Sequence, residues 1–88
     1  MPELSRFYGM TIQMYFKDTQ QHHKPHVHVV CEGDKAVVGI DGDLLVGRLS
    51  NKHMRVLLAW LTIHEEELYE AWNKAVNQQH FDKIKPLD

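Results

Sequence analysis

Four of the seven histidines of this 88-residue chain lie close together, in the segment HHKPHVH at residues 22–28. His26 and His28 are two residues apart in a valine-rich stretch that we expect to be a strand, so both imidazoles would project from the same face. Two imidazoles at this spacing can bind one transition-metal ion, and His23 in the preceding loop could supply a third nitrogen. The segment is therefore a candidate site for a divalent transition metal, and nothing in the chain points to another cofactor.

The same two histidines could instead carry acid–base chemistry. His26 and His28 would take and give a proton, as RNA cleavage requires, and Lys24 or Arg48 would supply a positive charge. The strand lacks the third alternating histidine of the histidine-triad nucleotide hydrolases, and the chain has no Gly-rich phosphate loop, so we do not expect nucleotide hydrolysis. A third reading stays open, in which the histidines only order the loop against the sheet.

The other reactive side chains are expected to be structural. Cys31 alternates with Val27 and Val29 on the face opposite the histidines, which predicts a buried, unreactive thiol. His64 lies on an apolar helical stripe, where a histidine usually packs and forms a hydrogen bond. Since Cys31 is the only cysteine, the chain has no internal disulfide, and a reducing compartment is indicated.

The first half of the chain must form the sheet that positions these residues. Stretches of alternating or β-branched apolar residues are separated by turn residues at 33–34 and 41–43. They predict an antiparallel meander of about four strands within residues 9–49, at residues 9–17, 26–32, 35–40 and 44–49. The polar residues 18–25 predict an exposed loop between the first two strands.

From Ser50 onward the period of the apolar residues changes from two to 3.6. Ser50 or Asn51 can cap the start of a helix, and apolar residues then recur at spacings of three and four along one stripe. We expect one long helix over about residues 51–77, with a break within residues 62–65 left open. The helix would cover one face of the sheet, giving a single α+β domain over residues 1–88.

Apolar residues outside this stripe are candidate contacts with a partner. Trp60 falls off the stripe and is expected to be partly exposed, and tryptophan is enriched at protein interfaces. The tail, residues 78–88, carries Phe81, Ile84 and Leu87 at a spacing of three in a polar segment. These tail residues could dock onto the domain or onto a partner, and with Trp60 they form the predicted interface.

Charge and hydropathy limit the classes of function. The chain has 10 Lys plus Arg against 12 Asp plus Glu, a net charge of −2, so it lacks the overall basic charge of a committed nucleic-acid binder, although a local basic patch leaves such binding open. No signal-peptide pattern and no run of about 20 apolar residues is present, so we expect a soluble, cytoplasmic protein without membrane contact. The two edges of the predicted sheet leave homodimerisation open.

Three segments together resemble a known family. Phe7-Tyr8-Gly9 before a strand, Pro25-His26-Val27-His28-Val29, and a C-terminal helix carrying Leu68 and Trp72 are similar to the small bacterial proteins grouped as domain of unknown function 4160. The resemblance extends over nearly the whole chain, and Pro-His-Val-His is its most specific part. It implies no catalytic residue, but it implies that the protein is encoded beside another small protein, in an arrangement that resembles toxin–antitoxin modules.

We therefore expect a small cytoplasmic protein that binds a partner protein as one component of a toxin–antitoxin-like module. The alternative is a metal-binding or RNA-cleaving module centred on His26 and His28. The sequence leaves open whether the protein is an enzyme.

Overall fold

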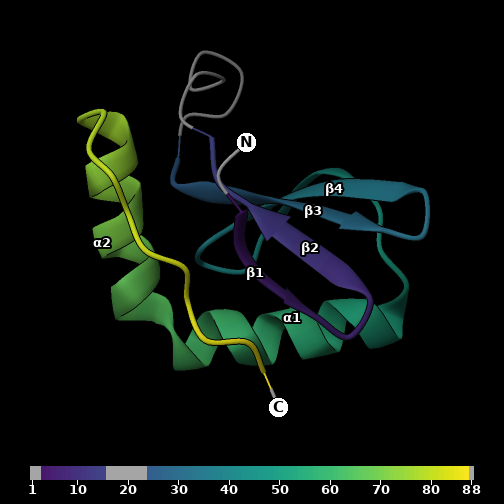
Figure 1. The fold of residues 1–88 in the computed structure, drawn as a ribbon. Helices are drawn as coiled ribbons and strands as arrows, with labels where there is room; N and C mark the ends of the chain where they lie inside the picture. Colours follow the sequence, from purple (N-terminus) through teal and green to yellow (C-terminus); the bar gives the residue numbers. More distant parts are fainter. Residues whose placement is uncertain (1–2, 16–23, 88) are drawn as a thin grey trace.

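The computed structural model describes residues 3–15 and 24–87 and has an α+β fold (Figure 1). Strands come first in the chain and helices follow. The elements are β1 (Glu3–Phe7), β2 (Met10–Gln13), β3 (His26–Cys31), β4 (Asp34–Gly39), β5 (Leu44–Gly47), α1 (Asn51–Ile63) and α2 (Glu65–Val76). No helix in this described part of the chain is long and apolar enough to cross a membrane.

The five strands form one antiparallel sheet in the order β1-β2-β3-β4-β5, the predicted meander with one strand more. Two of its hairpins have two-residue turns, at Tyr8-Gly9 and Glu32-Gly33, and all four of these residues have a positive φ. Such a turn twists in the sense of the flanking strands, and its second position, with φ +87° at Gly33, favours glycine.

The expected count of about four strands is wrong by one, because the sequence pattern does not show β1. Leu4 and Ser5 are both buried, and the register between β1 and β2 shifts between Glu3 and Ser5. This irregularity breaks the alternation by which a strand is recognised. The strands expected at residues 26–32, 35–40 and 44–49 correspond to β3, β4 and β5. The strand expected at residues 9–17 corresponds to β2, and its residues 16 and 17 lie outside the described residues.

The expected single helix is two helices that meet at His64. Ser50 caps α1, since its Oγ accepts a hydrogen bond from the backbone N–H of His53 at 3.1 Å. The break falls within the interval 62–65 that the sequence left open. The first turn of α2 contains three glutamates, at residues 65–67. Carboxylates interact favourably there with the free N–H groups of the helix start.

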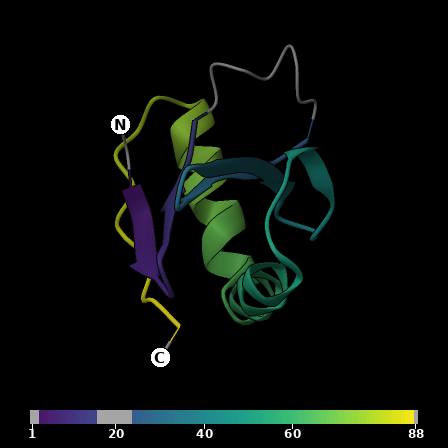
Figure 2. The same cartoon turned by 90° about the vertical axis from the view of Figure 1, so that its right-hand side faces the viewer.

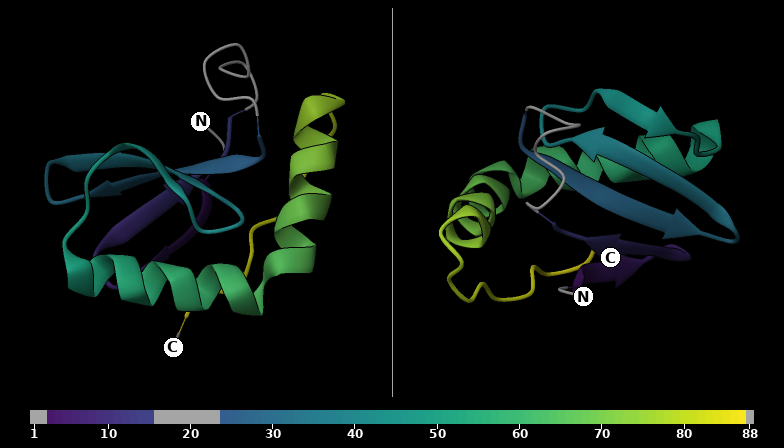
Figure 3. Two further views of the ribbon diagram at one scale, coloured as in Figure 1. Left: turned by 180° about the vertical axis from the view of Figure 1, so that it is seen from behind. Right: turned by 90° about the horizontal axis from the view of Figure 1, so that it is seen from above.

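Helix α1 lies along one face of the sheet, whereas α2 rises past the end of the sheet, beside the point where β2 ends and β3 begins (Figures 1 and 3). The core fills the space between the sheet and the helices. The alternation predicted for the strands is confirmed there: Met10, Ile12 and Met14 are fully buried, and Val27, Val29 and Cys31 are buried on β3. Burial, with the nearby carboxylates of Glu32 and Asp34, raises the pKa of the Cys31 thiol. A thiol with a raised pKa forms little of the reactive thiolate, as expected for a buried, unreactive cysteine.

The C-terminal tail folds back on the domain (Figure 2). The Ile84 N–H donates a hydrogen bond to the Leu4 carbonyl at 2.8 Å, so the tail adds to the outer side of β1. Ile84 is buried, and Phe81 and Leu87 pack partly buried against the core. Of the two outcomes expected for the tail, docking onto the domain is the one observed, and these three side chains already have contacts within the chain.

The prediction that Trp60 is partly exposed is wrong. Its side chain is fully buried, its ring packs on Phe7 with the centroids 5.2 Å apart, and its indole N–H donates to the Lys85 carbonyl at 2.9 Å. Trp60 lies off the apolar stripe of the helix, but the C-terminal tail packs over it and completes its burial. Trp60 therefore does not belong to a partner surface.

Candidate functional site

The face of the sheet that points away from α1, called here the outer face, is seen from above in Figure 3 (right). No helix of the described part covers its centre. One row of paired residues crosses four strands: Gln13 lies opposite His28, His28 opposite Val37, and Val37 opposite Val46. The side chains of directly paired residues project on the same face, so this row combines polar and apolar groups side by side.

A hollow of about 360 Å³ lies over this row. Its lining residues come from four strands and the segment after β2: Gln13, Tyr15, His28, Val29, Val30, Lys35, Ala36, Val37 and Val46. Val37 is only 8% exposed although it is outside the main core cluster. Val46, on the edge strand β5, is 50% exposed. The hollow thus has an apolar floor that extends to an open sheet edge.

Polar groups form the rim of the hollow. The Tyr15 hydroxyl donates a hydrogen bond to Gln13 Oε1 at 2.8 Å, and the Tyr15 ring meets the His28 ring edge-on, with centroids 4.4 Å apart. Gln13 Oε1 accepts this bond, and the amide NH₂ of the same side chain can donate two more. Lys35 is exposed and adds an ammonium group.

His26 is not at this rim. It is fully buried, its Nδ1–H donates to the Lys24 carbonyl at 2.8 Å, and its ring lies 4.9 Å from the Trp72 ring of α2. The two rings are neighbours on one side of β3, as predicted, with centroids 5.3 Å apart, but His26 is buried and not accessible. The reason is α2, which covers the beginning of β3 on the side where the histidine projects.

The metal site predicted from His23, His26 and His28 is not tested, because His23 lies outside the described residues. Within residues 3–15 and 24–87, no three His, Cys, Asp or Glu side chains come together in a way that could hold a metal ion. The His26 and His28 rings are neighbours, with centroids 5.3 Å apart, but only His28 lines the hollow.

The positive groups considered for RNA cleavage are already paired. Lys24 Nζ lies 2.8 Å from Asp41 Oδ2 and 2.7 Å from Asp43 Oδ2. These contacts raise the pKa of the Lys24 ammonium and lower the pKa of the Asp41 carboxyl. Arg48 lies 3.7 Å from Asp34. The arrangement of one buried histidine and two paired cations offers little support for a base, an acid and a free cation acting on one phosphate.

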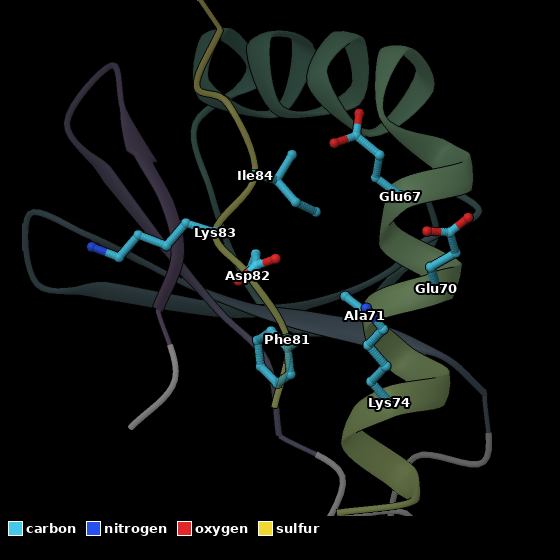
Figure 4. A pocket seen from close by; sticks show the side chains of 8 residues that line it. All are labelled: Glu67, Glu70, Ala71, Lys74, Phe81, Asp82, Lys83 and Ile84. Atoms are coloured by element: carbon cyan, nitrogen blue, oxygen red, sulfur yellow. The ribbon is translucent and has the colours of Figure 1, made fainter. Parts of the chain in front are cut away.

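A second, smaller hollow of about 150 Å³ lies between α2 and the tail (Figure 4). Glu67, Glu70 and Asp82 contribute carboxylates to it, but Glu67 Oε1 is 2.7 Å from His64 Nδ1. Lys83 points away from it (Figure 4) and its Nζ lies 3.6 Å from Glu3 of β1. These contacts fix the tail and the helix junction, so this hollow is a polar seam between packed segments, and His64 has the structural role expected of it.

The sequence also contains signals for the outer-face hollow, at residues outside the histidine segment. Gln13 and Tyr15 stand on the polar side of an alternating strand, and Val37 and Val38 are consecutive apolar residues on β4. Two apolar neighbours on one strand project to opposite faces, which indicates that both faces of β4 are partly covered. Gln13, Val37 and Val46 have residue types that do not suggest catalysis, and Tyr15 and Lys35 lie apart from the histidine segment in the sequence.

The two strand histidines are expected to differ sharply in their effect on stability. The variant His26→Ala removes a buried ring and its hydrogen bond, which we expect to cost about 2–3 kcal/mol and to lower Tm by roughly 10–20 °C. The variant His28→Ala, at the partly exposed rim, should cost less than about 1 kcal/mol. Thermal unfolding followed by circular dichroism measures both, and equal losses of stability would contradict the different placements of the two rings.

Comparison with known proteins adds a family but no activity. The model of the family described as domain of unknown function, DUF4160, matches residues 9–73. The matched stretch contains every residue that lines the outer-face hollow and ends before the tail. No curated protein and no solved structure shows significant similarity to the chain.

Proposed function

The chain belongs to the DUF4160 family, domains of unknown function, and on that premise we propose that it binds a partner protein through the hollow of its outer face. The partner would be a small protein encoded beside it, and the two would act in the cytoplasm as the components of a toxin–antitoxin-like module. The observation that carries the proposal is the apolar floor on a sheet face that no described helix covers.

The composition of the hollow supports protein binding. Stable protein interfaces have a well-packed apolar centre with aromatic groups and a polar rim that excludes water. Here Val37 and Val46 provide the centre, and Tyr15, Gln13 and Lys35 provide the rim.

The histidine-centred alternative has less support. A general base must reach the substrate proton within hydrogen-bonding distance, and the buried His26 has its Nδ1 engaged with Lys24 and its ring against Trp72. A metal site that includes His23 stays a prediction, and metal analysis of untagged protein tests it. Homodimerisation also stays a prediction, for which the open edge at β5 is the candidate surface.

The proposed interface is tested by a charged substitution on its floor. We expect the wild-type protein to form a complex with the product of the neighbouring gene, and Val46→Glu to weaken that complex at least tenfold, because the variant places a carboxylate in the apolar centre. The affinity is measured by isothermal titration calorimetry on the two purified full-length proteins.

The matched control is Val76→Glu. Val76 ends α2 and is 44% exposed, close to the 50% of Val46, but it does not line the hollow. It should bind as the wild type does. The absence of any complex would refute the proposed partner, and equal weakening by both variants would refute the proposed surface.

A further inference from the structure

The shape of the outer-face hollow restricts what can occupy it. Small-molecule pockets usually have volumes of about 300–1,000 Å³, so a hollow of about 360 Å³ holds one or two side chains and not a folded element. Its floor is formed by valines, and none of the described residues that line it has a carboxylate. A molecule that binds here must therefore insert an apolar side chain into the hollow.

The polar groups at the rim of the hollow determine which charge on a bound segment is favourable. Among the described lining residues only Lys35 has a permanent charge, and in that part of the chain it forms no ion pair. The other cation near this end of the sheet, Arg48, is beside Asp34. The Gln13 amide NH₂ and the Lys35 ammonium both present hydrogen-bond donors at the rim. Donors on a rim, one of them cationic, are complementary to carboxylates and backbone carbonyls.

A second copy of this chain fits the same surface poorly. A twofold axis would place one concave face on another, and the apolar floors would not touch. It would also bring Lys35 of one copy toward Lys35 of the other, and like charges across an interface are unfavourable. The charge and the concavity together favour a different chain with a projecting segment.

We propose that the outer-face hollow binds an acidic segment of the partner protein, with a large apolar side chain seated on Val37 and Val46 and an adjacent carboxylate paired with Lys35. This inference rests on the proposed partner-binding function and specifies the chemistry of the segment. It requires no reaction and no cofactor.

Capped peptides test this chemistry without the partner. The probes are acetyl-Glu-Leu-Phe-Glu-amide, its charge-reversed form acetyl-Lys-Leu-Phe-Lys-amide, and acetyl-Glu-Gly-Gly-Glu-amide, which lacks the apolar anchor. Each is titrated into the ¹⁵N-labelled full chain, and the amide shifts are followed by NMR. We expect the first peptide to shift the amides of Gln13, His28, Lys35, Val37 and Val46, and to bind at least fivefold more tightly than either of the others.

Variants of one residue separate pairing with Lys35 from general attraction. Lys35→Glu should reverse the preference between the acidic and basic peptides, and Lys35→Arg should preserve it. Lys74→Glu, an equal charge change on α2 outside the hollow, should leave it unchanged. Shifts elsewhere on the protein, equal binding of the three peptides, or the same response in Lys35→Glu and Lys74→Glu would overturn the inference. The partner-binding proposal itself is tested separately, by the calorimetric titration of the two full-length proteins.

Discussion

Replacing Trp60 by alanine is expected to destabilise the protein strongly. The change removes a fully buried side chain and its contact with Phe7, and large-to-small substitutions of this kind cost about 3–5 kcal/mol. It also removes the donor to the Lys85 carbonyl, which helps to hold the tail. A domain of this size has a total stability of only about 4–13 kcal/mol, so one substitution removes a large part of it.

Urea unfolding followed by far-ultraviolet circular dichroism gives the size of this effect. The variant Trp60→Phe keeps an aromatic ring in the core and loses the hydrogen bond, so it should lose clearly less stability than Trp60→Ala. Ile63→Ala changes a residue of the same helix that is 64% exposed and should be near neutral. If Trp60→Ala were no less stable than Ile63→Ala, the docking of the tail over Trp60 would be wrong.

The second large effect is expected at Gly47, at the end of β5. Its φ is +80°, and a Cβ built there would lie 2.0 Å from the Lys35 carbonyl oxygen and 3.0 Å from Ala36 Cα. The same carbonyl accepts the Arg48 N–H at 3.2 Å, so backbone rather than a flexible side chain must move. We expect Gly47→Ala to cost about 3 kcal/mol or more and to loosen the pairing of β4 with β5.

The matched control for Gly47 is Gly33. It has a similar φ of +87°, but a Cβ there meets nothing within 4 Å. Gly33→Ala therefore carries only the cost of the left-handed conformation, about 1–2 kcal/mol. Chemical unfolding compares the two variants, and amide hydrogen exchange of Val37 and Val38 reports on the pairing with β5. Equal losses of stability would show that the steric contact with Lys35 is relieved at no cost.

Local sequence rules predicted the parts of the fold that depend on neighbouring residues. The turn at Gly33, the alternation of Val27, Val29 and Cys31, and the Ser50 cap are each determined within a few residues, and each was predictable. The junction at His64 was foreseeable only as an interval, because the apolar stripe continues across it. The irregular β1 could not be recognised, because the adjacent residues Leu4 and Ser5 are both buried and the register shifts between Glu3 and Ser5.

The candidate site was harder to predict, because distant segments determine which side chains are accessible. His26 has the residue type and spacing of a ligand, yet α2 returns from later in the chain and buries it under Trp72. The floor of the hollow depends on the pairing of β3, β4 and β5, which brings His28, Val37 and Val46 into one row. Residue type identified the chemistry, but tertiary packing decided which residues can use it.

The hydrogen bond from Ile84 to Leu4 also has a consequence for the order of folding. It joins segments near opposite ends of the described sequence, whereas the strands of the meander pair with their immediate neighbours. Contacts between distant segments carry the larger loop-closure entropy and form more slowly. We therefore expect the contacts of the tail to form later than the pairing of the strands. Until the tail docks, Trp60 lacks its cover and the outer edge of β1 is unpaired, so this edge is the part of the sheet most open to pairing with another chain.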